Sequence, residues 1–198
     1  MKKMILIMLA ALSITGTIIV LPINGEEEIY DKVIRLHILA NSDSDEDQRV
    51  KLLVRDSLLE YVSCLIADAE DIEAAKAIIS EHIGDIETVA ENVLINEGFG
   101  DSASAEIGYE VYPERGYDGL KLPAGEYCSL RVSIGRAEGH NWWCVLFPPL
   151  CLSASKPKDV LVQAGFTENQ VRILTDSDNP KYVLRFKFLE VLQSLKRR

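Results

Sequence analysis

The sequence predicts an α+β protein in which two or three helices pack on a mostly antiparallel sheet. Three observations support this class. An apolar strand comes first, two helical regions with apolar residues at intervals of three and four follow, and the next part of the chain alternates apolar and polar residues as strands do. Residues 26–198 have an ordinary length for one hydrophobic core, so we expect a single compact exported domain after an N-terminal export segment at residues 1–25.

The N-terminal segment has the layout of a secretory signal. Two lysines precede residues 4–23, which carry no charge, and this order matches the positive and apolar parts of a signal peptide. The apolar run is nearly long enough to span a bilayer, and Ile23 is a poor residue three positions before a cut at Glu26. We therefore expect residues 1–25 to be either a signal peptide or an N-terminal membrane anchor, and to make the only membrane contact.

The first strand is predicted over residues 33–40, where apolar and β-branched residues indicate burial on both faces. His37 lies in this strand, so we expect it to be a hydrogen-bonded core histidine. Ser44 is a favourable N-cap, and Asp47 follows three residues later in an arrangement close to a capping box. The helix then extends over about residues 45–65, with one apolar stripe.

A second helical region covers about residues 71–96. Gly84 lies in its middle and is expected to kink it or to divide it into two helices. Alternation then predicts a strand over residues 104–111. Residues 113–125 contain three glycines and two prolines, so they are predicted to form a loop.

A hairpin is predicted next, from strands at residues 128–134 and 142–147. If the turn centres near Glu138, Val132 faces Cys144, and the apolar faces of the two strands coincide.

The C-terminal region is predicted to hold a short helix at residues 159–164, ended by Gly165, and a longer helix at residues 181–195. Residues 184–188 also alternate as a strand would, but the length of the pattern and the basic residues after it favour a helix.

The charge balance excludes one class of partner. The whole chain has 21 Lys and Arg against 31 Asp and Glu, and residues 26–198 carry a formal charge of about −12. So acidic a domain repels nucleic acid and anionic lipid headgroups. We therefore expect no nucleic-acid role.

The four cysteines are expected to form one or two disulfides, because an exported chain meets an oxidising compartment. They allow three complete pairings, and the sequence does not choose among them. Their spacing does not match a zinc site, so no metal is predicted. The candidates are Cys64, Cys128, Cys144 and Cys151.

Catalytic motifs give little support to an enzyme. The chain has no nucleophile elbow, zinc-protease, P-loop or dinucleotide fingerprint, and we expect neither catalysis nor a cofactor. The acidic run at residues 43–47 resembles a calcium loop but lacks its glycine and its final glutamate, so a capped helix start is preferred. His140 lies four residues before Cys144, which leaves a Cys-dependent transferase or a cell-wall hydrolase as the alternative.

The segment at residues 140–151 is the most unusual part of the chain. It holds both tryptophans, two of the four cysteines and a double proline. Adjacent strand residues point to opposite faces, so Trp142 and Trp143 are predicted to diverge. One of them packs in the core, and the other lies either under a helix or in solvent, where it would be a natural interface anchor.

Two separated motifs resemble the stage II sporulation protein R family. The first is Ile34–Ser44, with Asp47-Gln48 and residues 51–56 behind it, and the second is Asn141–Cys151. Because two motifs occur in the right order over roughly residues 29–151, the match is specific. The resemblance implies a protein that is made in the forespore and exported into the space between the forespore and mother-cell membranes.

The resemblance also implies a function. Proteins of this family activate a membrane-embedded aspartic protease of the mother cell, which processes the pro-form of the sporulation sigma factor E. This makes the chain a signal between compartments rather than a catalyst, whereas a structural scaffold at the septum is a further alternative. The loop after the first strand and the start of the last strand are the candidate contacts with the protease, which comprise Asn41, Asp43, His140, Asn141, Trp142 and Trp143.

Overall fold

The computed structural model describes residues 29–117, 119–150 and 156–175. Its elements are, in chain order, β1 (Ile34–Leu39), α3 (Asp45–Leu65), α4 (Ile72–Glu81), α5 (Ile83–Asn96), β2 (Ala103–Tyr112), β3 (Arg115–Tyr117), β4 (Leu120–Leu122), β5 (Gly125–Ile134), β6 (Asn141–Phe147), α6 (Pro157–Gln163) and α7 (Glu168–Thr175).

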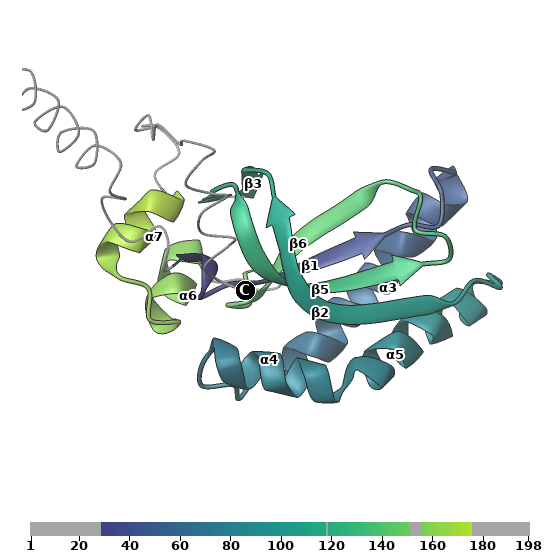
Figure 1. Ribbon diagram of the computed structural model, residues 1–198, viewed down its shortest axis with the longest axis horizontal. Coiled ribbons are helices and arrows are strands. Elements are labelled where there is room, and N and C mark those ends of the chain that lie inside the picture. Colours follow the sequence, from purple (N-terminus) through teal and green to yellow (C-terminus); the bar gives the residue numbers. More distant parts are fainter. Residues whose placement is uncertain (1–28, 118, 151–155, 176–198) are drawn as a thin grey trace, which may run out of the picture.

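The predicted α+β class is confirmed. Helices α3, α4 and α5 cover one face of the main sheet, while α6 and α7 lie at one end of it, away from the loop that connects β5 to β6 (Figure 1). The predicted export segment at residues 1–25 and the predicted helix at residues 181–195 lie outside the described residues. None of the helices in the described ranges is long and apolar enough to cross a bilayer.

The main sheet has four strands in the order β2-β5-β1-β6. Strand β1 pairs in parallel with β5 and antiparallel with β6, and β2 pairs antiparallel with β5. The sheet is therefore mixed but mostly antiparallel. The predicted hairpin between residues 128–134 and 142–147 is wrong, because β1 lies between these two strands.

The apolar pattern of the two strands did not reveal the insertion. Ile38 is paired with Val132 on one side and with Trp142 on the other, so all three face the same way. An inserted strand preserves which face each neighbour presents, because side chains directly across from one another share a face. The apolar and β-branched residues of β1, which predicted burial on both faces, were the better signal of a central strand. In the structure every residue of β1 is buried except His37, which is half-buried.

The helical layer begins and divides for identifiable reasons. The Ser44 side chain accepts a hydrogen bond from the Asp47 N–H, which confirms the predicted N-cap of α3. The predicted second helical region is two helices, and they meet at His82, two residues before Gly84. The His82 ring contacts the Ile78 carbonyl through Nδ1 at 2.9 Å and is half-buried at the junction.

One hydrophobic core fills the space between the helices and the sheet. Its central members come from β1, α3 and α5, and all are fully buried: Leu36, Ile38, Val54, Leu58, Ile86 and Leu94.

A second core lies on the opposite face of the sheet and extends to the small helices. It includes Tyr112, Leu122, Tyr127, Leu161 and Leu174. The prediction of a loop over residues 113–125 is wrong in part, because β3 and β4 form a small antiparallel hairpin there. The predicted short helix is confirmed as α6, and Gly165 follows it with a φ of 78°. Helix α7 was not predicted.

Candidate partner-binding surface

Two loops contact each other at the end of the sheet where β1 ends and β6 begins. They comprise residues 40–44 and residues 135–140 and are called the docked loops here. The Gly139 N–H donates to the Ala40 carbonyl at 2.9 Å, which extends the pairing of β1 with β6 beyond the strands. A Cβ on Gly139 would overlap the Ser42 carbonyl, so only glycine permits this approach.

Asn41 connects three parts of the surface. Its Nδ2 donates to Asp47 at 3.1 Å, its Oδ1 accepts from the Arg136 N–H at 3.0 Å, and its carbonyl accepts from the Glu138 N–H at 3.2 Å. The side chain therefore holds the start of α3 against the second docked loop. This predicted binding residue is half-buried and has a clear structural task.

Asp43 and His140, which are far apart in sequence, are brought into contact. Asp43 Oδ1 accepts from the His140 N–H at 2.6 Å and also contacts the His140 ring at Nδ1. Lys51 Nζ donates to the His140 carbonyl at 2.8 Å, and burial lowers the pKa of this lysine. Both predicted side chains remain accessible, with 56% of Asp43 and 75% of His140 exposed.

Asp47 is the buried carboxylate of the docked loops. It accepts from the Ser42 hydroxyl and from Asn41, and the Ser42 hydrogen bond is the main cause that lowers the pKa of Asp47. The acidic run is therefore a capped helix start whose buried carboxylate is already satisfied. In the ranges that the structure covers, no group of three or more His, Cys, Asp and Glu side chains could hold a metal ion.

The two tryptophans point to opposite faces of β6, as predicted. Trp142 lies on the helix side, where the Arg55 guanidinium carbon is 5.1 Å from its ring centroid. Trp143 lies on the other side, 5.7 Å from the His37 ring, and the Arg115 guanidinium carbon is 4.3 Å from its centroid. Both are half-buried, and each has an arginine over its ring.

A polar network lies beside Trp143 on the second face. His37 contacts Glu110 through Nδ1 at 3.0 Å and Asn141 through Nε2 at 2.7 Å, which confirms the predicted hydrogen-bonded histidine. The Tyr112 hydroxyl donates to Glu110 at 3.1 Å and lies 2.6 Å from the Ser129 hydroxyl. Burial raises the pKa of Glu110, but the hydrogen bonds, led by that from His37, outweigh it and lower the pKa to about 2.

Arg35 is fully buried behind this network. Its Nη2 donates to the Tyr117 hydroxyl at 2.6 Å, and its guanidinium carbon lies 3.8 Å from the Tyr112 ring centroid. Within the described residues, its Nε and Nη1 have no hydrogen-bond partner. A buried cation without a carboxylate is costly, and the face of the Tyr112 ring offsets part of that cost.

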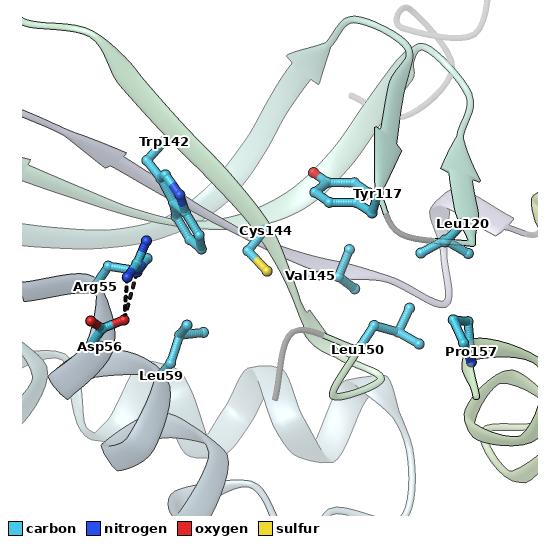
Figure 2. Close-up of a pocket in the computed structure, with 10 residues that line it drawn as sticks. All are labelled: Arg55, Asp56, Leu59, Tyr117, Leu120, Trp142, Cys144, Val145, Leu150 and Pro157. Atoms are coloured by element: carbon cyan, nitrogen blue, oxygen red, sulfur yellow. Dashed lines mark hydrogen bonds and ion pairs between the residues drawn. The ribbon is translucent and has the colours of Figure 1, made fainter. Parts of the chain in front are cut away.

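A pocket of about 410 Å³ opens next to β6, between α3 and the β3–β4 hairpin (Figure 2). Arg55, Asp56 and Leu59 contribute its α3 wall, and Trp142 with Cys144 contributes its β6 wall. The docked loops, the two tryptophans and this pocket are therefore neighbours along one strand.

The three cysteines that the structure describes do not form a reactive site with histidine. Cys64 and Cys128 are free thiols, the first exposed and the second buried, and burial raises the pKa of Cys128. Cys144 is 4% exposed and disulfide-bonded, whereas Cys151 lies outside the described residues. His140 instead contacts Asp43, and four residues of extended chain put it about 13 Å from Cys144. The Cys–His pair of the enzyme alternative is thus not assembled.

Sequence reasoning missed several residues of this surface. Lys51 and Arg55 belong to the motif segment at residues 51–56 but were not singled out as surface residues, and Gly139 belongs to no motif. Their roles depend on contacts between distant segments. Arg35 did give a signal, because it shares a face of β1 with His37 and alternates with apolar residues. That alternation was a signal of a face with mixed polarity, and our prediction of two apolar faces did not use it.

The fold and this surface define an α+β domain with polar loops fixed in place beside half-buried aromatic side chains, a construction suited to binding. The chain belongs to the stage II sporulation protein R family, whose model matches residues 30–156. It is 40% identical over 123 residues to the stage II sporulation protein R of Bacillus subtilis (strain 168), covering 62% of this chain and 55% of that protein. The chain thus spans about half the length of this relative. No solved structure matches. Family membership confirms the resemblance and supports a role in sporulation.

Replacing Gly139 by alanine should destabilise the docked loops. The new Cβ would meet the Ser42 backbone, which cannot move without breaking the loop contacts, so we expect a loss of about 1–3 kcal/mol. Gly84→Ala is the matched control, because nothing lies within 4 Å of its Cβ and it should stabilise α5 by about 0.5–1 kcal/mol. Urea unfolding of the purified proteins measures both, and equal stability of the two variants would contradict the close approach.

Glu110 should make the free energy of unfolding depend on pH in the acid range. Its pKa is about 2 in the fold against an ordinary 4.5, so its stabilising contribution is complete above about pH 4.5 and is lost as the pH falls toward 2. We expect the stability difference between the unaltered protein and Glu110→Gln to shrink over that interval. Unfolding curves recorded from pH 6 to pH 2 test this, and a constant difference would show that Glu110 keeps its ordinary pKa.

Proposed function

We propose that this chain is an exported signalling protein that activates a membrane-embedded aspartic protease of the mother cell. That protease processes the pro-form of sporulation sigma factor E. The observation that carries the proposal is membership of the stage II sporulation protein R family across residues 30–156, which include both of the motifs on which the resemblance rests. The chain acts in this proposal by binding and not by catalysis.

The docked loops supply a surface suited to this role. Their hydrogen bonds hold Asp43 and His140 in one arrangement before any partner arrives, so little conformational entropy is lost on binding. Trp142 and Trp143 add half-buried aromatic area directly beside them, and aromatic residues are the commonest anchors of interfaces. Activation requires that this surface bind the active state of the protease more tightly than the inactive state.

Export is part of the proposal. Residues 1–25 would carry the domain across the forespore membrane into the intermembrane space, and would tether it there if they are not removed. Cys144 and Cys151 would pair in that oxidising space, while the free Cys64 and Cys128 take no part. Cys144 is disulfide-bonded while Cys64 and Cys128 are free, and this supports the pairing.

Removing exposed side chains of the proposed surface should weaken signalling. His140→Ala leaves the backbone bond to Asp43 in place, and we expect it to lower protease affinity roughly fivefold or more. Asn141→Ala should act similarly, although it also removes a contact to His37. Processing of the sigma-factor precursor in sporulating cells is the measurement, with the secreted amount of each variant determined in parallel.

Val162→Ala on α6 is the control for these variants, because it also truncates an exposed side chain, at the far end of the domain. It should signal normally. Asp43→Ala, Trp142→Ala and Trp143→Ala extend the test to the remaining candidates. Normal processing by every variant of the surface would place the protease contact elsewhere.

The mass of the exported protein tests the other two parts of the proposal, which are the removal of residues 1–25 and the disulfide. Removal of residues 1–25 should leave a chain that starts at Glu26, and one disulfide should lower its mass by about two hydrogens relative to the reduced protein. Intact mass spectrometry with and without reductant measures both the first residue of the exported chain and the presence of the disulfide. A mass that does not change on reduction would exclude the disulfide, and the full-length mass would indicate a tethered signal.

A further inference from the structure

Strand β2 forms one edge of the main sheet, and among the strands that the structure describes it pairs only with β5 (Figure 1). In an antiparallel pair, alternate residues direct their backbone N–H and C=O groups toward the neighbour and away from it. The Ala103 and Ala105 N–H groups bond to side chains of α5 instead of to β5. The odd-numbered residues of β2 therefore direct their backbone groups to the open edge.

The first half of this edge is covered and the second half is not. Glu91 accepts from the Ala103 N–H at 3.4 Å, and Glu87 accepts from the Ala105 N–H at 2.8 Å. In the described structure, no side chain accepts a hydrogen bond from the outward N–H groups of residues 107–111. Natural edge strands are usually protected by charged side chains, above all lysine, by proline or by a bulge. Residues 107–111 contain no lysine, proline or bulge. The charges nearby are Glu110, on the other face of the strand, and Lys76 of α4, which donates to the Tyr109 hydroxyl at 3.3 Å and so reaches the side chain of Tyr109 and not its backbone.

The uncovered half also exposes apolar side chains. Tyr109 is 57% exposed and Val111 is 79% exposed, which makes them two of the five most exposed large hydrophobic residues of the described chain. Ile107 precedes them on the same face and is half-buried. A free backbone edge beside an apolar ladder is the surface to which another strand adds.

We propose that the second half of β2 pairs antiparallel with the same strand of a second copy of this chain, around a two-fold axis at Tyr109. This register puts Tyr109 opposite itself and Ile107 opposite Val111. All three positions have outward backbone groups, so each pair exchanges two hydrogen bonds, for a total of about six. The apolar ladder then becomes continuous across the two copies.

The same register explains where the pairing ends. The next pair outward joins Ala105 to Pro113 of the second copy. The Ala105 N–H is already bonded to Glu87, and Pro113 has no N–H to donate. Neither residue of that pair therefore has a free N–H to donate to the other copy. Because of the two-fold axis, the pairing stops in the same way at both ends.

The opposite face of the paired strands is compatible with a second copy as well. Gly108 lies across from Glu110 of the second copy in this register, so the two Glu110 carboxylates are not directly opposed. Each chain nevertheless has a formal charge of −10. Because this repulsion is screened by salt, the dimer should strengthen as ionic strength rises.

The test compares two valine-to-lysine variants of the full chain, purified in detergent. Val111→Lys places a charge beside Ile107 of the second copy on both sides of the axis, and we expect the dimer to weaken by about tenfold or more. Val162→Lys changes the same residue type at a 58% exposed position on α6 and should leave the dimer unchanged. Sedimentation velocity across a concentration and salt series measures the association of both variants.

Cysteine cross-linking provides a second test, which detects whether the two β2 strands lie next to each other. In a Cys64→Ser background, Tyr109→Cys should cross-link to its copy with a short bismaleimide, whereas Val162→Cys should not. Monomers at every concentration and salt level, or a dimer that Val111→Lys leaves intact, would overturn the proposal. A monomeric unaltered chain whose Val111→Lys variant fails to signal would assign this edge to a different protein and would also reject the dimer.

Discussion

The pairing of β1 with β5 on one side and with β6 on the other determines where the other elements lie. Because β1 is central, its two faces must be covered by different layers. Leu36 and Ile38 face the helices, whereas Arg35 and His37 face the aromatic side chains of β2, β5 and β6. One short strand thus supports an apolar core on one side and a polar, aromatic layer on the other.

The same pairing creates the candidate surface. The connection from β5 to β6 must pass the end of β1, and it contacts the loop that leaves β1 for α3. Asn41 and Asp43 hold this crossing together, and therefore two residues that looked like binding candidates also have structural tasks. The side chains that remain accessible, above all His140, are placed by those contacts. A substitution at Asn41 consequently changes geometry as well as chemistry, whereas one at His140 changes mainly chemistry.

Local signals in the sequence were sufficient for β1, for the longer helices and for the long strands, but not for α7, for the β3–β4 hairpin or for which strands pair with each other. The Ser44 cap, the apolar stripe of α3 and the alternation in β2 depend on residues a few positions apart. The position of β1 between β5 and β6 depends on pairing across about a hundred residues, and the alternating pattern is identical with or without it. The candidate residues were found through their composition and the family resemblance, while Lys51, Arg55 and Gly139 matter through contacts that only the folded chain creates.

The adjacent positions of the two tryptophans on β6 give the protein a built-in optical probe. The chain has no other tryptophan, so its long-wavelength fluorescence originates at this one strand. Trp142 emits from beside Arg55 and the pocket, and Trp143 emits from beside His37 and Arg115. Any ligand that excludes water from either face of β6 would change the emission without a chemical label, and the two Trp→Phe variants would assign the change to one face.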